Sequence, residues 1–174
     1  MNNIRLRPAT IQDGPTILSW RNDPLSRQFS FQTEPIELEH HMQWWLASLK
    51  NPARTILVLE NENGEGLGSL RKDKLPTGEI ELSWMIAPEH RGKGLGSSML
   101  RLGIHGTTAR FITRIKPENT ASCRMRSRLH VHADLSHAMY SWRMRMHLGA
   151  VIQLSSNKYI YRLLEFNTEQ VGYR

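Results

Sequence analysis

Three glycines that alternate with other residues, Gly92, Gly94 and Gly96, form the part of this 174-residue sequence whose spacing most clearly allows chemistry. They lie between an apolar, strand-like run over residues 80–86 and a helix-like run over residues 97–109. Glycine lets backbone N–H groups approach a ligand closely, and the start of a helix adds partial positive charge. We therefore expect an anion, specifically a pyrophosphate, to bind in this loop.

The glycine spacing disfavours the two commonest phosphate loops. A Walker loop needs Gly-Lys-Ser/Thr at a fixed distance from its first glycine, and a Rossmann fingerprint needs its third glycine three residues after the second. Neither spacing is found around residues 87–98. ATP and NAD are therefore disfavoured as ligands.

The loop resembles the R/Q-x-x-G-x-G signature of the GNAT superfamily of acyl-CoA-dependent N-acetyltransferases, matched by Arg91, Gly94 and Gly96. The resemblance implies that acetyl-CoA is the co-substrate, that the loop binds its pyrophosphate, and that no metal is needed. The cofactor-binding residues expected in the loop are Arg91, Gly92, Lys93, Gly94, Leu95, Gly96 and Ser97. The alternative is a glycine-rich helix start with one exposed arginine.

Composition is that of an ordinary soluble domain, with 39% hydrophobic and 22% charged residues. The single cysteine excludes an internal disulfide and a cysteine-clustered zinc site. No apolar run reaches the length of a membrane span, and the N-terminus lacks the apolar stretch of a signal peptide, so we expect a cytoplasmic protein.

The net charge of +7 is unevenly distributed. Residues 101–150 hold nine Lys and Arg against two Asp and Glu. This basic half fits polyanionic ligands such as CoA or nucleotide sugars, and it also fits nonspecific nucleic-acid binding. For any single arginine, a solvated helix face remains the alternative.

Hydrophobic periodicity predicts alternating strands and helices along the whole chain. Strands are expected at 4–7, 55–60, 66–71, 78–86, 110–116, 151–154 and 158–164, and helices at 11–20, 36–49, 97–109 and from about 120 to 147. This order is similar to that of the GNAT fold, an α/β (α+β) fold. The resemblance implies one domain over 1–174 with a mixed, mostly antiparallel sheet of six to seven strands flanked by helices.

The second half departs from the family pattern. Asn119 and Ser122 resemble the family's N-x-x-S helix start, which contacts CoA, although an ordinary helix N-cap is the alternative. The position of the family's tyrosine acid holds Arg126. The sequence frame of 122–131 recurs at 141–150, so we expect an unusual helical excursion over about 122–150 and a short tail over 166–174.

Acetyl transfer by direct attack of an amine on the thioester requires no protein nucleophile, because CoA is the leaving group. The resemblance implies that the backbone N–H groups of Ile86 and Ala87 hold the thioester carbonyl. It also implies that Glu81 is the general base, although a solvent-facing strand carboxylate is the alternative for it. Tyr159 is our candidate for the acid that protonates the thiolate.

The N-terminal third resembles bacterial acetyltransferases that act on amino-sugar nucleotides, of the pseudaminic acid pathway type. The shared frame is W-R-N at residues 20–22, then Arg27 and Ser30, and a segment over residues 39–45, Glu-His-His-Met-Gln-Trp-Trp, that resembles E-H-x-x-W. Arg21 and Arg27 are expected to pair with a substrate pyrophosphate, and Trp44 to stack on a base or sugar. The alternatives are salt-bridged surface arginines and core tryptophans. Trp45 is expected in the core, because the helix over 36–49 has an apolar face formed by Leu38, Met42, Trp45, Leu46 and Leu49.

The leading hypothesis is therefore an N-acetyltransferase that moves an acetyl group from acetyl-CoA to a small-molecule amine. An amino-sugar nucleotide is the first candidate for that amine. Two alternatives stay open, a protein N-terminal or ribosomal-protein acetyltransferase and a non-catalytic CoA- or nucleic-acid-binding module. Under the leading hypothesis we expect no membrane or nucleic-acid partner, and a homodimer is possible.

Overall fold

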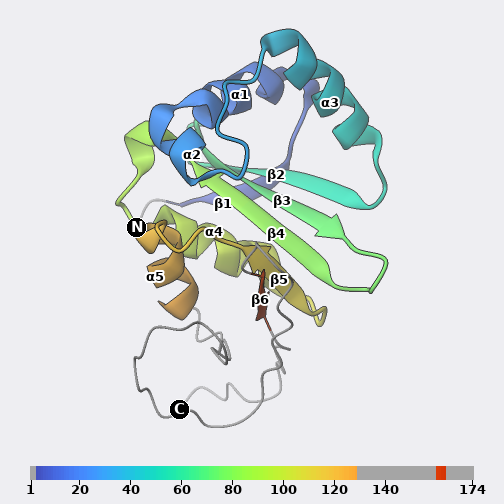
Figure 1. Cartoon of the computed structure of the whole chain (residues 1–174), viewed down its shortest axis with the longest axis vertical. Coiled ribbons are helices and arrows are strands. Elements are labelled where there is room, and N and C mark those ends of the chain that lie inside the picture. Colours follow the sequence, from blue (N-terminus) through green and yellow to red (C-terminus); the bar gives the residue numbers. More distant parts are fainter. Residues whose placement is uncertain (1–2, 129–159, 164–174) are drawn as a thin grey trace, which may run out of the picture.

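A single mixed sheet forms the centre of the computed structural model, which describes residues 3–128 and 160–163 (Figure 1). The strands follow one another in sequence order: β1 (Arg5–Pro8), β2 (Arg54–Glu60), β3 (Gly66–Lys74), β4 (Ile80–Ile86), β5 (Phe111–Arg114) and the short β6 (Ile160–Leu163). All neighbours are antiparallel except β4 and β5, which are parallel. The expected mixed, mostly antiparallel sheet is thus confirmed, whereas the strand expected at 151–154 and most of the 122–150 excursion lie outside the described residues.

Helices cover both faces of the sheet (Figure 1). On one face lie α1 (Gly14–Asn22), α2 (Pro24–Phe29) and α3 (Leu38–Lys50), and on the other lie α4 (Leu95–Ile104) and α5 (Thr120–Arg128). Short 3₁₀ turns occupy Ile11–Asp13 and Pro88–His90. Within residues 3–128 and 160–163, no helix combines the length and apolarity that crossing a bilayer requires.

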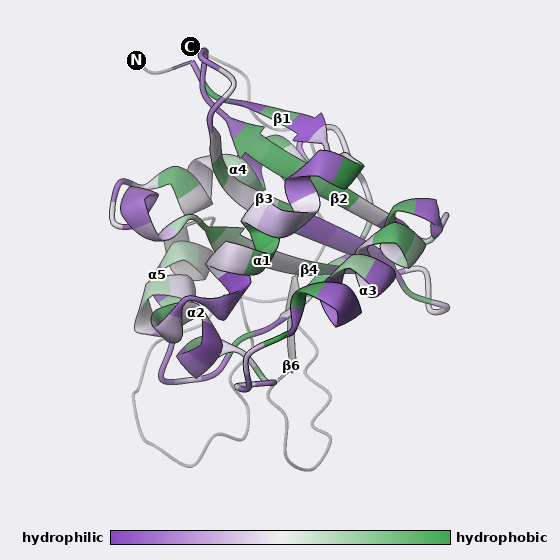
Figure 2. Ribbon diagram, turned by 90° about the horizontal axis from the view of Figure 1, so that it is seen from above, coloured by the Kyte–Doolittle hydropathy of each residue, from purple (hydrophilic) through white to green (hydrophobic). Residues whose placement is uncertain are grey.

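Each face of the sheet has its own hydrophobic core, because neighbouring strand residues point to opposite faces. Leu59 of β2 packs with Met99 of α4, while the adjacent Val58 packs with Trp20 of α1 and Trp45 of α3. Trp45 is completely buried, which confirms its expected place in the core. Helices α1 and α3 lie over one face of the sheet, and α2 is coloured mostly hydrophilic (Figure 2).

Helix α3 begins at Leu38 and not at residue 36 as expected. The Asn22 side chain accepts from the N–H of Ile36 at 2.9 Å and donates to its carbonyl oxygen at 2.8 Å. Because the Asn22 side chain satisfies both backbone groups of Ile36, these groups do not need hydrogen bonds within the helix. A side chain 14 residues away therefore sets the start of the helix.

The buried side of α3 also differs from the apolar face read from the sequence. His41, Trp45 and Ser48 are buried, whereas Leu38 and Leu46 are exposed. The His41 Nε2 atom lies 3.0 Å from the Gly14 carbonyl oxygen, so a polar residue takes an interior position by hydrogen bonding. Burial, the largest cause, lowers the pKa of His41 against the opposing effect of that bond.

Helix α2 was not expected, because the sequence pattern predicts no helix between residues 20 and 36. Asp23 accepts from the N–H of Ser26 at 3.0 Å and so acts as an N-cap, and Pro24 takes the first helical position. The same proline ends α1. One Asp-Pro pair thus both stops a helix and starts the next.

Helix α4 begins two residues earlier and ends five residues earlier than expected, spanning Leu95–Ile104. Gly94, in the left-handed conformation with φ of 77°, precedes it, and Gly106, with φ of 68°, turns the chain after it. Left-handed backbone favours glycine, so these two residues determine where the helix can run.

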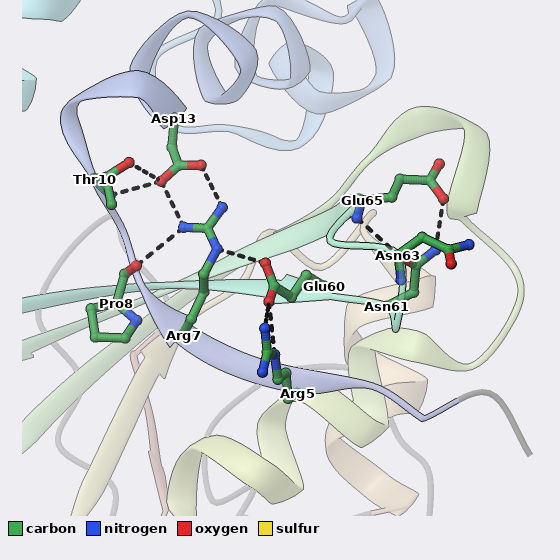
Figure 3. A network of polar contacts seen from close by, with 9 residues as sticks. All are labelled: Arg5, Arg7, Pro8, Thr10, Asp13, Glu60, Asn61, Asn63 and Glu65. Carbon is green, nitrogen blue, oxygen red and sulfur yellow. Dashed lines mark hydrogen bonds and ion pairs between the residues drawn. The ribbon is translucent and has the colours of Figure 1, made fainter.

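Arginines and carboxylates bind β1 to β2 and to the turn that follows β1 (Figure 3). Arg7 donates to Glu60 at 2.6 Å and to both oxygens of Asp13 at 2.7 and 2.8 Å, and Arg5 donates to Glu60 at 2.7 Å. The bond from Arg7 is the main cause that lowers the pKa of Asp13 to about 2, and bonds from Arg7 and Arg5 lower that of Glu60.

Candidate active site

Strands β4 and β5 part halfway along β4. Their ladder runs from Ile80 paired with Phe111 to Leu82 paired with Thr113 and then stops, while β4 continues to Ile86 beside β3. Ser83 is exposed although β4 is flanked by strands on both sides. Within the described residues, the edge of β4 beyond Leu82 is therefore open toward β5.

Two hydrogen bonds show which backbone groups face this opening. The Ile80 N–H donates to Arg110 on the β5 side at 2.9 Å, and the Ala87 N–H donates to Leu67 on the β3 side at 3.0 Å. Since strand residues alternate, the even-numbered Trp84 and Ile86 face the opening. The expectation that the Ala87 N–H binds the thioester carbonyl is wrong, because this N–H already donates to Leu67 of β3. Trp84 was not predicted, because the sequence does not show how β4 pairs with its neighbouring strands.

A row of free backbone N–H groups lies beyond the end of β4. None of the N–H groups of residues 92–96 has a hydrogen-bond partner within the described part of the chain. Gly92 and Gly94 have φ of 78° and 77°, which other residues adopt rarely. Gly96 instead provides clearance, since a β-carbon there would collide with Met125 of α5.

Arg91 points away from this row and toward α2. Its Nη1 atom lies 2.7 Å from Asp23 Oδ2, and its Nη2 atom donates to Ser26 Oγ at 2.7 Å. The guanidinium that the sequence assigned to the pyrophosphate is thus bound to two residues at the start of α2.

Other expected cofactor residues of the loop have simple environments. Lys93 is exposed, with its ammonium nitrogen 3.4 Å from His90 Nδ1. Leu95 packs against the core under α4. The Ser97 N–H donates to the Gly94 carbonyl at 3.1 Å, so that group belongs to the first turn of the helix.

Asn119 is an N-cap of α5, which was the alternative interpretation of the N-x-x-S sequence. Its Oδ1 atom accepts from the Ser122 N–H at 3.1 Å, and its carbonyl accepts from Cys123 at 3.0 Å. Helix α5 packs against α4, next to the glycine loop. A contact of Asn119 or Ser122 with CoA stays a prediction.

Glu81 forms a bidentate ion pair with Arg114. Arg114 donates to Oε1 at 2.7 Å and to Oε2 at 2.8 Å. By strand alternation Glu81 shares with Ser83 the face covered by α1 and α3. Both carboxylate oxygens are thus held by a cation from the neighbouring strand, and sequence spacing gave no sign of this partner.

Arg21 and Arg27 come together at the ends of α1 and α2. Arg21 Nη1 and Arg27 Nε are buried without a hydrogen-bond partner in the described structure. Burial, and then the charge of Arg27, lower the pKa of Arg21. Arg21 Nη2 donates to the Gln32 carbonyl at 2.6 Å. Within the described residues neither arginine forms an ion pair with a carboxylate, so the alternative of salt-bridged surface arginines receives no support there.

Trp44, a further expected site residue, lies in α3. Trp44 is 39% exposed, and the Arg54 guanidinium lies over its ring, with Cζ 5.5 Å from the ring centroid. Tyr159 lies outside the described residues. Residues 3–128 and 160–163 contain no group of three or more His, Cys, Asp or Glu placed to hold a metal ion.

Known proteins share both the sequence and the fold. Residues 3–132 match the acetyltransferase (GNAT) domain family. An L-methionine sulfoximine/L-methionine sulfone acetyltransferase of Pseudomonas paraeruginosa is 30% identical over 71% of this chain and 77% of its own length. An uncharacterized protein of Methanocaldococcus jannaschii is 30% identical over 49% of this chain, but the match spans only 18% of that longer protein.

The fold is also that of a spermidine N-acetyltransferase from Vibrio cholerae solved with CoA and spermine. The TM-score is 0.71 and the identity 16%, over 91% of this chain and 92% of the other. Together with the family match over residues 3–132, the Pseudomonas relative settles the classification. The chain belongs to the GNAT acetyltransferase family.

Proposed function

We propose that this chain transfers the acetyl group of acetyl-CoA to a primary amine on a small molecule. The observation that carries the proposal is the open edge of β4 beside the row of unpartnered N–H groups at 92–96. Unpaired backbone donors next to a helix start attract phosphate, and an open strand edge offers donors and acceptors to an extended chain. CoA has both parts, a pyrophosphate and an amide-bearing arm.

Different groups of this chain bind different parts of acetyl-CoA in the proposed complex. The N–H groups of 92–96 hold the pyrophosphate, and the outward-facing backbone of Trp84 and Ile86 binds the arm and the thioester. Asn119 and Ser122 border the loop from α5. The V. cholerae enzyme was solved with CoA, which supports the same ligand here.

The proposed chemistry is direct attack. The neutral amine attacks the thioester carbonyl, whose oxygen accepts from the Ile86 or Trp84 N–H as it gains negative charge. The carbon–sulfur bond then breaks, the thiolate takes one proton, and the amine loses one. Glu81 is proposed to receive the amine proton, directly or through water, from its place on the face shared with exposed Ser83. Tyr159 remains the proposed acid.

An amino-sugar nucleotide remains the first acceptor to test. Two adjoining guanidinium groups, each with one buried nitrogen that has no partner in the described structure, suit an anionic substituent such as a pyrophosphate. The carboxylate of an amino acid offers the same chemistry, and the Pseudomonas relative acts on the amino-acid analogues in its name. A homodimer and a cytoplasmic location also stay proposals.

Isothermal titration with CoA tests the cofactor site. Gly94→Ala forces a side chain into left-handed backbone inside the loop, and we expect at least tenfold weaker binding. Gly64→Ala is a matched control, because Gly64 has the same φ of 77° and open space, but lies in the β2–β3 turn. Equal affinities for the two variants, or no binding by the folded wild type, contradict the proposed site.

An amine panel tests the reaction by thiol release from acetyl-CoA. It contains 4-amino UDP-sugars, amino acids, polyamines, aminoglycosides and peptides. Glu81→Gln is expected to lower kcat by roughly 100-fold, in the range typical of general bases. Arg114→Gln is its control, because it removes the partner of Glu81 and leaves the carboxylate in place. CoA binding without turnover of any amine points instead to a non-catalytic module.

A further inference from the structure

One arginine joins the cofactor loop to the short helix that bears an expected substrate residue. Arg91 immediately precedes the free N–H groups of 92–96, and its guanidinium contacts Asp23 and Ser26 at 2.7 Å each. These partners lie more than 60 residues away in the chain, at the cap and in the first turn of α2. We call the contacts of Arg91 with Asp23 and Ser26 the Arg91 bridge.

The Arg91 bridge is important for the position of α2, because this helix makes few other contacts that hold it in place. The helix spans six residues, none of them buried, and its segment is mostly hydrophilic (Figure 2). Lys116 contributes one further contact, from its ammonium group to the Gln28 carbonyl at 3.1 Å. Without a buried apolar face, the position of α2 depends on such polar contacts.

Asp23 is ionised and forms an ion pair with Arg91. Burial alone would raise its pKa, but hydrogen bonds from the Ser26 N–H and Arg91, with the charge of Arg91, lower it overall. One carboxylate oxygen, Oδ2, serves both the helix cap and the guanidinium. Moving Arg91 therefore disturbs the start of α2 directly.

We infer that Arg91 is a positioning residue that links CoA binding at residues 92–96 to the placement of α2 and of Arg27. This inference rests on the proposed function. CoA fixes the loop, the loop fixes Arg91, and Arg91 holds the first turn of α2 through Asp23 and Ser26. The acceptor side of the site is thereby ordered before the amine arrives, which lowers the entropic cost of binding it.

The competing arrangement is that Arg91 leaves Asp23 and pairs with the pyrophosphate itself. It predicts the opposite response of α2. Transfer of the guanidinium to CoA releases Asp23 and loosens the helix, whereas the bridge tightens it. The sign of the CoA-dependent change at α2 separates the two.

Amide hydrogen exchange with and without saturating CoA measures that sign, and it needs no knowledge of the amine. In the wild type we expect CoA to slow exchange at 92–96 and, by roughly fivefold or more, in the α2 segment that includes the Arg27 and Ser30 amides. The comparison is between the bound and free states of the same protein, so a purely structural loss of stability cancels.

Two variants break the bridge from its two ends. Arg91→Ala removes the guanidinium, and Asp23→Asn removes the charge but keeps an oxygen for the helix cap. Both are expected to keep CoA-dependent protection at 92–96 and to lose it at α2. Lys93→Ala is the matched control: it removes a cation two residues away that has no contact with α2, and α2 protection should persist at equal CoA occupancy.

Each outcome decides something different. Loop protection without a change at α2 in the wild type overturns the inference alone, as does faster exchange at α2, or α2 protection that survives in Arg91→Ala. No CoA-dependent change at 92–96 in the folded wild type overturns the proposed function, and the inference with it.

Discussion

Two clusters in this molecule are built around a pair of arginines, but carboxylates balance the charge in only one of them. In the β1 cluster, Arg7 meets two carboxylates, Asp13 and Glu60, with every distance under 3 Å (Figure 3). In the α1–α2 cluster, Arg21 and Arg27 adjoin one another, each with a buried nitrogen that has no partner in the described structure.

The first cluster stabilises the fold, whereas the second is the one that we propose binds an anionic ligand. A buried cation with matched carboxylates recovers its lost hydration within the protein. Two unmatched guanidinium groups cost stability, and such a cost persists mostly where function needs it. Asp23, the nearby carboxylate, is already engaged by Arg91.

The largest effect is expected from removing one arginine of the α1–α2 cluster. Arg27→Met keeps most of the volume and removes the charge, so we expect kcat/KM for an anionic amine to fall by at least tenfold, and roughly 100-fold for two lost charge-assisted bonds. The measurement is thiol release with the best amine of the panel. An uncharged amine is the control, and equal losses for both amines contradict anion recognition.

The same kind of change in the β1 cluster should act on stability. Arg7→Ala leaves Glu60, whose side chain is 4% exposed, with only the exposed Arg5. We expect the melting temperature to fall by roughly 5 °C, because a buried charged group loses a partner. Scanning calorimetry measures it, with Arg5→Ala as the control of smaller effect. An unchanged melting temperature would mean that the pairing contributes nothing.

Acidification should weaken the β1 cluster as well. Asp13 has a pKa of about 2 in the folded protein against 3.8 as its ordinary value, and Glu60 is also lowered. Groups with lowered pKa values contribute stability above their unfolded pKa and lose it as the pH falls through the folded one. We expect the urea midpoint to fall between about pH 4 and pH 2, and less steeply in Asp13→Asn. Equal slopes contradict the role of Asp13.

The smallest expected effect is that of Arg27→Met on thermal stability. Arg27→Met should leave the melting temperature unchanged or raise it by roughly 1–2 °C, because it relieves repulsion with Arg21 and removes an unpartnered buried donor. Its sign is thus opposite to that of Arg7→Ala. A fall similar to that of Arg7→Ala would show that both clusters serve the fold.

The sequence predicted the features that depend on local spacing. Gly92, Gly94 and the strand before them identified the loop, because left-handed glycines and apolar alternation are encoded nearby. The order of strands and helices followed for the same reason. Helix α2 was missed because its signal, an Asp-Pro pair, also marks a break.

What escaped prediction depends on contacts between distant residues. Ala87 was assigned as a donor, but only the register with β3 shows that its N–H is taken by Leu67. Arg91 was read from its place in the motif, while its partners lie on α2. Glu81 was proposed without Arg114, which comes from the strand that is parallel to its own.

The pairing of β1 with β2 has a consequence for how the chain folds. Arg5 lies opposite Glu60, with three helices between them in the sequence, whereas β2, β3 and β4 follow one another through short turns. Closing the longer loop costs more chain entropy and defers the contacts that repay it. The β2–β4 meander should therefore acquire protected amides first in a refolding experiment. The N-terminal strand, although synthesised before all the others, should be docked onto its edge afterwards.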